Sequence, residues 1–163
     1  HGMRIITVPT QQNLIEALNP QIKSLNYLNN ILAKIEAIHG GCEEAIMLNK
    51  DGLVTECTGD NIFIVKKGIL STPPSYVGLL KGITRGAVIE IAARQKVPFR
   101  EEVLTRHDLF NADECFLTGT AAEIVPIVKI DSRNIGEGKP GPITAKLRAE
   151  FHKIVKKEGV KVK

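Results

Sequence analysis

Residues 45–65 read AIMLNKDGLVTECTGDNIFIV, and this stretch says more about the architecture than any other part of the chain. Its apolar runs are short, rich in β-branched residues and broken by turn dipeptides such as Asp51-Gly52, a pattern typical of strands joined by tight turns. We therefore predict strands at 45–48, 53–54 and 62–65. The same criteria, applied to the flanking sequence, predict strands at 3–8, 69–70, 97–104, 115–118 and 124–130.

Helices are predicted between and after these strands, at 24–38, 84–95, 106–112 and 142–157. In the first of them Leu25, Leu28, Leu32 and Ile35 recur at helical spacing, and Gly40-Gly41 ends the pattern. Short strands with interspersed helices predict an α/β or α+β layered domain. The order is not a regular βαβ alternation, and neither GxGxxG nor GxxxxGK[ST] occurs, which argues against a doubly wound nucleotide-binding fold.

Length and composition indicate one globular domain, since the 163 residues are 43% hydrophobic and 25% charged, close to globular averages. No apolar run approaches the about 18 residues of a membrane span, and the first residues do not form a signal peptide. The cysteines, Cys42, Cys57 and Cys115, are odd in number and lack CxxC spacing, which indicates a reducing compartment. The histidines also lack metal-ligand spacing. We expect a soluble cytoplasmic protein without a metal site.

The formal net charge is +4, and much of the excess lies at the C-terminal end, in Lys153, Lys156, Lys157, Lys161 and Lys163. Positive charges in the last turn of a helix interact favourably with the helix dipole, so we interpret this run as a solvent-exposed helix end. Tryptophan is absent and aromatic residues make up only 4%, which leaves few stacking surfaces for single strands. We therefore expect neither a nucleic-acid partner nor a membrane partner.

Four segments stand out when they are considered together: IKSLNYL at 22–28, TECTGDN at 55–61, LKGITR at 80–85 and TGTAAE at 118–123. Singly, each has an ordinary explanation. Lys23 could be a solvated lysine, Glu56 an exposed carboxylate, Thr84 a helix cap, and residues 118–122 a turn between strands.

In this order and with these gaps, the four segments resemble the large C-terminal domain of fold-type IV pyridoxal-phosphate enzymes. The runs KSLNYLNN, GDNIF and GTAAE make the chain most similar to the branched-chain amino acid aminotransferases of that family. The resemblance covers about residues 2–151. It implies mixed strands in a pseudo-barrel with flanking helices, a single pyridoxal 5′-phosphate-binding catalytic domain over residues 1–163, and transamination of leucine, isoleucine and valine with 2-oxoglutarate.

The resemblance assigns the central chemistry to three residues. Pyridoxal chemistry needs an amine that forms an aldimine with the cofactor and then transfers a proton, and Lys23 matches the family's lysine. Burial beside other cationic groups would favour loss of the Lys23 proton near neutral pH. By the same resemblance, Glu56 keeps the pyridine nitrogen protonated, and Tyr27 donates to the phenolic oxygen of the cofactor.

The resemblance also implies which residues hold the phosphate and the substrate. A dianion without its own counterion suits helix-start amides and short hydroxyl groups. Ile83 and Thr84 match the family's phosphate cup, and Thr120 matches its second hydroxyl. Leu80 matches the apolar side chain on the face of the ring, and the backbone amides of Thr120, Ala121 and Ala122 match those that receive the substrate carboxylate.

The chain departs from the family pattern in two ways. Cys57 stands where the family has glycine after the glutamate, and its side chain either crowds the loop or is harmless. The family's smaller N-terminal domain, which supplies an arginine to the phosphate and side chains to the substrate pocket, has no match here. We therefore expect a catalytic domain without that small domain, assembled as a homodimer or higher homo-oligomer as in the family.

Two alternatives stay open. A D-amino acid aminotransferase or an aminodeoxychorismate lyase of the same family would share Lys23, Glu56 and the phosphate cup, and would differ mainly in the substrate pocket. A non-catalytic domain that binds a partner subunit is the alternative from another class. Retention of both the lysine and the glutamate argues against it, since a binding domain needs neither.

Overall fold

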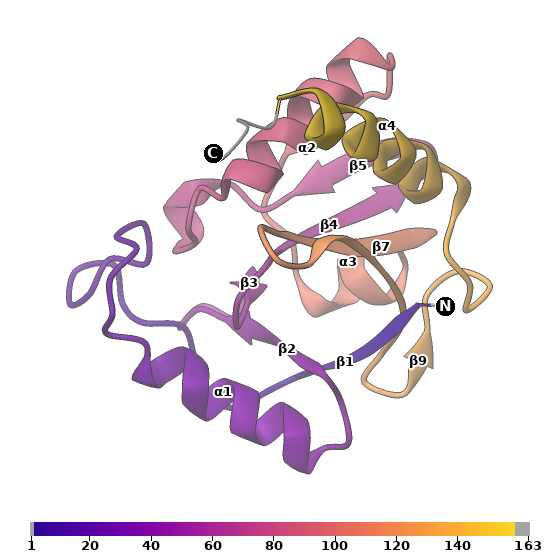
Figure 1. Ribbon diagram of the computed structural model, residues 1–163. Helices are drawn as coiled ribbons and strands as arrows, with labels where there is room; N and C mark the ends of the chain where they lie inside the picture. Colours follow the sequence, from indigo (N-terminus) through magenta and orange to yellow (C-terminus); the bar gives the residue numbers. More distant parts are fainter. Residues whose placement is uncertain (1, 159–163) are drawn as a thin grey trace.

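The computed structural model describes residues 2–158 of the chain (Figure 1). Over these residues the strands are β1 (Met3–Thr7), β2 (Glu44–Leu48), β3 (Val54–Cys57), β4 (Asn61–Lys66), β5 (Ile69–Thr72), β6 (Phe99–Glu101), β7 (Glu114–Gly119), β8 (Glu123–Ile130) and β9 (Arg133–Asn134). The helices are α1 (Leu28–His39), α2 (Ile83–Arg94), α3 (Arg106–Phe110) and α4 (Pro142–Glu158), with a 3₁₀ turn at Ser75–Val77. Lys161 and Lys163 of the basic C-terminal end lie outside the described residues.

The strands form one mixed sheet in the order β3-β2-β1-β8-β7-β4-β5-β6, with β9 paired to β8. Strand β1 runs parallel to both of its neighbours, and β5 runs parallel to β6. The other pairs are antiparallel. The mixed order confirms the expected α/β (α+β) class and differs from the parallel sheet of a doubly wound fold.

The sheet curls until β3, at one edge, contacts β4 on the other side of the curve. Side chains from β1, β2, β3, β4, β7 and β8 share one core inside this curve, including Ile5, Ile46, Val54, Ile62, Leu117 and Ile127. Leu109 of α3 packs into the same core. This arrangement is a half-barrel, in agreement with the pseudo-barrel of mixed strands that the resemblance implied.

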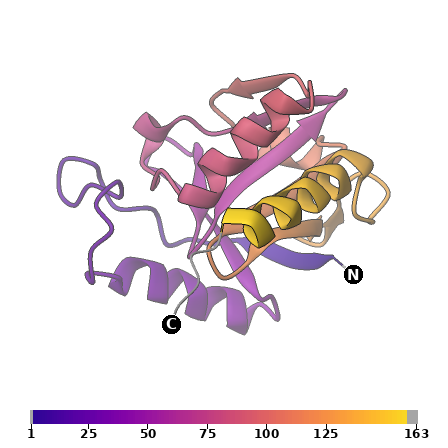
Figure 2. The same ribbon diagram turned by 45° about the horizontal axis from the view of Figure 1, so that its top comes forward.

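Helices α2 and α4 cover the opposite face of the sheet, and Figure 2 shows them side by side. Along β4, Ile62 and Ile64 belong to the half-barrel core, whereas Phe63 and Val65 pack with residues of α2 and α4. Successive side chains of a strand point to opposite faces, so a strand covered on both faces is apolar throughout. Phe63 also stacks on Phe116 of β7, with ring centroids 5.0 Å apart.

Helix α1 packs on β1 and β2 (Figure 1). Ala33 and Ala37 are fully buried, in a small cluster with Ala45 and Met47 of β2. The helix begins at Leu28 and not at residue 24, because residues 13–27 form an irregular loop. The leucines and isoleucines whose spacing predicted this helix do not form its buried face: Leu25, Leu28, Leu32 and Ile35 are all exposed.

The sheet edge also differs from the prediction. Strand β6 covers only Phe99–Glu101 of the predicted 97–104. After β6 the chain leaves β5, and the Leu104 carbonyl accepts a hydrogen bond from the Val54 amide of β3. Strand β3 continues to Cys57, and the two-residue strand β9 was not predicted. Among residues 2–158, no helix has the length and apolarity that crossing a membrane requires.

Candidate active site

A cleft of about 710 Å³ opens where the four sequence segments converge. Its walls come from the loop before α1, the end of β3 with the turn that follows, the start of α2, and the turn between β7 and β8. Most of the predicted site residues line the cleft, namely Lys23, Tyr27, Glu56, Leu80, Ile83, Thr84, Thr120 and Ala121, whereas Ala122 does not. Such a volume is typical of sites for small molecules and cofactors.

Glu56 is the most deeply buried of these ionisable groups, with 7% of its surface exposed. Its Oε1 accepts a hydrogen bond from Nε2 of Gln12 at 2.9 Å. Its Oε2 accepts from the Leu80 amide at 3.1 Å and from Nδ2 of Asn61 at 3.2 Å. Burial raises the pKa of Glu56 to about 8, against the lowering effects of the Leu80 and Gln12 hydrogen bonds and of the Lys23 charge. The carboxyl group therefore holds a proton at neutral pH.

Asn61 connects this carboxyl to the segment that leads into α2. Besides Glu56, its Nδ2 also donates to the Leu80 carbonyl, at 2.8 Å. The Asn61 side chain lies so close to Gly82 that a Cβ on the glycine would come within 2.2 Å of Asn61 Oδ1. A side chain at this position would displace Asn61 from its hydrogen bonds to Glu56 and Leu80, so glycine suits the close approach of α2 to the end of β3.

The first turn of α2 presents free amide groups to the cleft. Gly82 is the N-cap, and no side chain caps this helix start, so the alternative explanation of Thr84 as a helix cap does not hold. Thr84 is buried within the first turn. Arg85 anchors this turn, since its guanidinium donates to the Pro73 carbonyl at 3.0 Å and also pairs with Glu101. Free amides at a helix start attract anions, and here they are fixed in place.

Lys23 lies in the loop before α1 and lines the cleft near Glu56. The burial that would favour loss of the Lys23 proton is absent here, and the whole run from residue 21 to residue 28 is exposed. Tyr27, at the end of the same loop, donates its hydroxyl proton to the main-chain carbonyl of Thr58. Burial raises the pKa of Tyr27, and the nearby carboxylates of Glu56 and Glu44 raise it further.

The turn between β7 and β8 forms the remaining wall. Thr120 and Ala121 are exposed there, while Thr118 Oγ1 is buried and is one of three such side-chain atoms without a partner over residues 2–158. Gly119 touches the neighbouring turn so closely that a Cβ on it would meet Asp60 Oδ1 at 2.0 Å. Glu123, which follows this turn, has a φ of 56° and contacts His152 of α4 at 2.8 Å.

Cys57, the departure from the family pattern, is 1% exposed and packs in the half-barrel core. Burial raises the pKa of its thiol well above the usual range, so the group acts as a small apolar side chain. The sequence carries no signal for the contact between Gln12 and Glu56, because the two residues lie 44 positions apart and meet only when the loop after β1 returns to β3.

The cleft thus combines a primary amine, a protonated carboxyl group and several hydrogen-bond donors without partners. Such a set can bind an anion, donate a hydrogen bond to a basic nitrogen, and carry protons to and from a bound molecule.

Comparisons with known proteins agree with this geometry. A family model described as amino-transferase class IV matches residues 1–130. The chain is 53% identical over 161 residues to a putative branched-chain-amino-acid aminotransferase of Methanocaldococcus jannaschii, covering 99% of this chain and 56% of that protein.

Two crystal structures are also similar to the chain. A branched-chain aminotransferase from Thermoproteus uzoniensis with norvaline gives a TM-score of 0.93 at 44% identity, over 97% of this chain and 53% of that one. The PLP-form of the enzyme from Thermobaculum terrenum gives 0.92 at 39% identity, over 95% and 51%. The chain spans about half the length of these proteins.

Proposed function

The chain belongs to the class IV aminotransferase family, and on that premise we propose that the full-length protein is a pyridoxal 5′-phosphate enzyme that transaminates branched-chain L-amino acids. The proposed second substrate is 2-oxoglutarate. One observation carries the proposal: the Lys23 amine and the buried carboxyl of Glu56 line the same cleft as the uncapped start of α2.

The residues of the cleft fit a phosphorylated pyridine aldehyde. The amides of the first α2 turn lack a side-chain cap, and Thr118 Oγ1 is a buried hydroxyl without a partner. Both features suit a polyanionic group that accepts hydrogen bonds. Glu56, buried and protonated at neutral pH, suits a basic ring nitrogen. The exposed Lys23 amine suits an aldehyde that must be reached from solvent.

In this proposal each residue has a defined task. When bound, pyridoxal phosphate withdraws electrons from the α-carbon of the amino acid, which acidifies its C–H bond. Lys23 Nζ takes this proton as a general base. It later returns the proton as a general acid, which completes the transfer of the amino group. Glu56 holds a proton at the ring nitrogen, and Gln12 and Asn61 fix its carboxyl group.

The remaining residues bind and orient. The phosphate is held by the amides of Ile83 and Thr84 and by the hydroxyl groups of Thr84 and Thr120. Leu80 packs on the ring. Tyr27 directs its hydroxyl to the phenolic oxygen. The amides of residues 120–122 receive the substrate carboxylate, and the small side chains of Ala121 and Ala122 allow a close approach. An enzyme built this way releases the first oxo acid before the second binds, so we expect ping-pong kinetics.

The test is an assay of the full-length protein with 2-oxoglutarate and one amino donor: leucine, isoleucine, valine or D-alanine. The glutamate that forms is measured. We expect glutamate with the three branched-chain L-amino acids. Glutamate with D-alanine alone would assign the protein to the D-amino acid aminotransferases. No glutamate with any donor would favour a lyase or a binding domain. Lys23→Ala should abolish turnover, whereas Lys50→Ala, at an exposed turn away from the cleft, should not.

We also propose that the protein forms a homodimer or higher homo-oligomer in the cytoplasm. The exposed aliphatic face of α1, made of Leu28, Ile31, Leu32, Ile35 and Ile38, supports self-association, because contiguous apolar patches of this kind mark protein interfaces. We name this set the α1 face. The free thiols of Cys42, Cys57 and Cys115 support a reducing compartment.

A further inference from the structure

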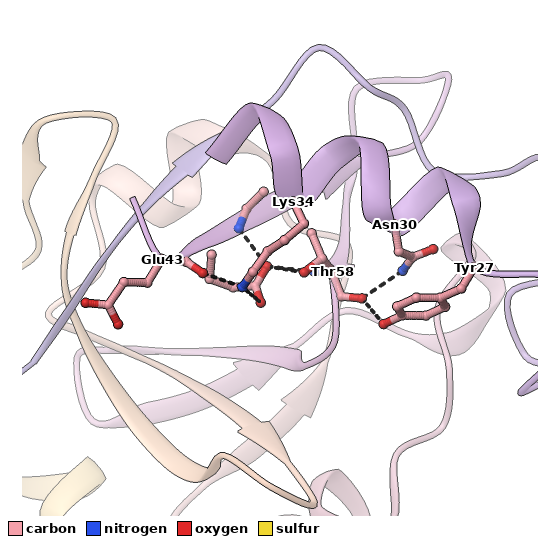
Figure 3. Close-up of polar contacts among 7 residues, drawn as sticks. Tyr27, Asn30, Lys34, Glu43 and Thr58 are labelled. Carbon is pink, nitrogen blue, oxygen red and sulfur yellow. Dashed lines mark hydrogen bonds and ion pairs between the residues drawn. The ribbon is translucent and has the colours of Figure 1, made fainter. Parts of the chain in front are cut away.

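The main-chain carbonyl of Thr58 accepts two hydrogen bonds at the rim of the cleft (Figure 3). One comes from the Tyr27 hydroxyl and the other from Nδ2 of Asn30, at 2.9 Å. A carbonyl oxygen has two lone pairs, so both are used. Tyr27, Asn30 and Thr58 all line the cleft. The position of this one carbonyl therefore determines where the phenol of Tyr27 lies.

Glu44, from the start of β2, holds Thr58 from behind. Its Oε1 accepts hydrogen bonds from the Thr58 amide at 3.0 Å and from the Thr58 hydroxyl. The two donors of Thr58 thus end on a single carboxylate oxygen. That oxygen also accepts from the Ala45 amide at 2.7 Å. Glu44 is 5% exposed and is not among the described residues that line the cleft.

The other carboxylate oxygen of Glu44 pairs with α1. Lys34 Nζ lies 3.1 Å from Oε2 and also donates to the main-chain carbonyl of Glu43. Tyr27, Asn30 and Lys34 follow one another at intervals of three and four residues, so they share one side of the helix. Figure 3 shows Tyr27 and Asn30 directed toward Thr58, with Lys34 on the same side of the helix, while the carboxylate of Glu43 points away. With a cation and three further donors, the buried carboxylate is fully paired.

We propose that Glu44 is a positioning residue for Tyr27: it fixes Thr58, and the Thr58 carbonyl fixes the phenol at the cleft. The inference rests on the proposed function for the ligand that Tyr27 meets, and deepens it. Asn30 gives the arrangement a second property. Because Asn30 stays on the carbonyl, Tyr27 can turn its proton toward a bound ligand without leaving a buried acceptor unpaired. Tyr27 is held in place, yet its proton can be redirected.

The chain offers a direct optical test, since it has two tyrosines and no tryptophan. In a Tyr76→Phe background, with Tyr76 itself 69% exposed, the intrinsic fluorescence comes from Tyr27 alone. Acrylamide quenching of this signal at neutral pH, without cofactor, reports how accessible the phenol is in the folded chain. The variants are Glu44→Gln and Glu44→Asp. Glutamine removes the charge and keeps the length, whereas aspartate keeps the charge and is shorter by one methylene, so the two variants disturb the contact in different ways. The matched control is Glu43→Gln, at the exposed neighbour.

Both Glu44 variants should raise the quenching constant by about twofold, the ratio of full exposure to the present 44%, while circular dichroism shows a folded chain. Glu43→Gln should leave it unchanged. Folded Glu44 variants with the original quenching constant would overturn the proposal, because a purely structural carboxylate changes stability and not the Tyr27 signal. If the Glu44 variants do not fold, Thr58→Val decides: it removes only the hydroxyl donor, and we expect a smaller rise, whereas no rise overturns the proposal.

The measurement needs no cofactor, so its result is independent of the enzyme assay. A quenching change without transaminase activity would leave the role of Glu44 standing and refute the proposed function. Transaminase activity with an unchanged quenching constant would refute the role of Glu44 and leave the proposed function standing.

Discussion

The buried carboxyl of Glu56 makes the stability of the folded chain depend on pH. Its pKa is raised from 4.5 to about 8, so the folded state binds more protons than the unfolded state between these values. The free energy of unfolding must therefore fall as the pH rises through this window. Above pH 8 the carboxylate is ionised and buried, and it destabilises the fold.

Glu56→Gln removes this ionisation and keeps the shape of the side chain. We expect the variant and the original chain to be similar in stability at pH 5. At pH 9 the variant should be more stable by about 2–5 kcal/mol, the order of magnitude that the shift implies. Urea unfolding at the two pH values measures this, with exposed Glu43→Gln as the control. A stability difference that is the same at both pH values would contradict the burial argument.

Individual site residues could be predicted from the sequence only where they belong to a motif that matches the family. Lys23, Tyr27 and Glu56 belong to quoted motifs, and the structure places all three along one cleft. Gln12 and Glu44 were not predictable, because their roles depend on contacts with residues 44 and 14 positions away. The exposure of Lys23 was also not predictable, since no pattern in the sequence indicates whether another segment covers residues 21–28, and none does in the described structure.

In helix α1, the periodicity of the apolar residues determines that a helix forms, but not which side of the helix packs on the sheet. The spacing of Leu28, Leu32 and Ile35 correctly predicted a helix. It did not identify the side that packs on the sheet, because Ala33 and Ala37 permit a closer approach than leucine would. The strands were predicted better, since those of the half-barrel are covered on both faces and are therefore apolar throughout.

The α1 face leads to a prediction about assembly. Replacing Leu32 and Ile35 by lysine should leave the fold intact, because these side chains are 47% and 43% exposed. In the full-length protein the double variant should weaken self-association at least about tenfold, as expected when apolar anchors leave an interface. Sedimentation velocity measures this. Val155→Lys, at an aliphatic position of α4 that is 47% exposed, is the control. An unchanged oligomer would mean that another segment covers the α1 face.

At the scale of the whole molecule, the length of the chain predicts its affinity for the cofactor. The chain spans about half the length of its relatives, and the resemblance assigns an arginine of the small N-terminal domain to the phosphate. One charge-assisted contact is worth about 1.5–3 kcal/mol, or about one to two decades of affinity. We expect the 163-residue chain to bind pyridoxal 5′-phosphate that much more weakly than a protein of the relatives' length, and to transaminate poorly. Titration by absorbance measures both affinities, and equal values would contradict the expectation.

Four segments spread over about a hundred residues line one cleft with Lys23, and we propose that this cleft is the cofactor site. The most direct test is to incubate the full-length protein with pyridoxal 5′-phosphate, reduce it with borohydride, digest it and locate the bound phosphopyridoxyl group by mass spectrometry. We expect one stoichiometric label, on the peptide that contains Lys23, and no such label in Lys23→Ala. A label spread over surface lysines, or a stoichiometric label on another lysine of the cleft such as Lys81, would contradict it.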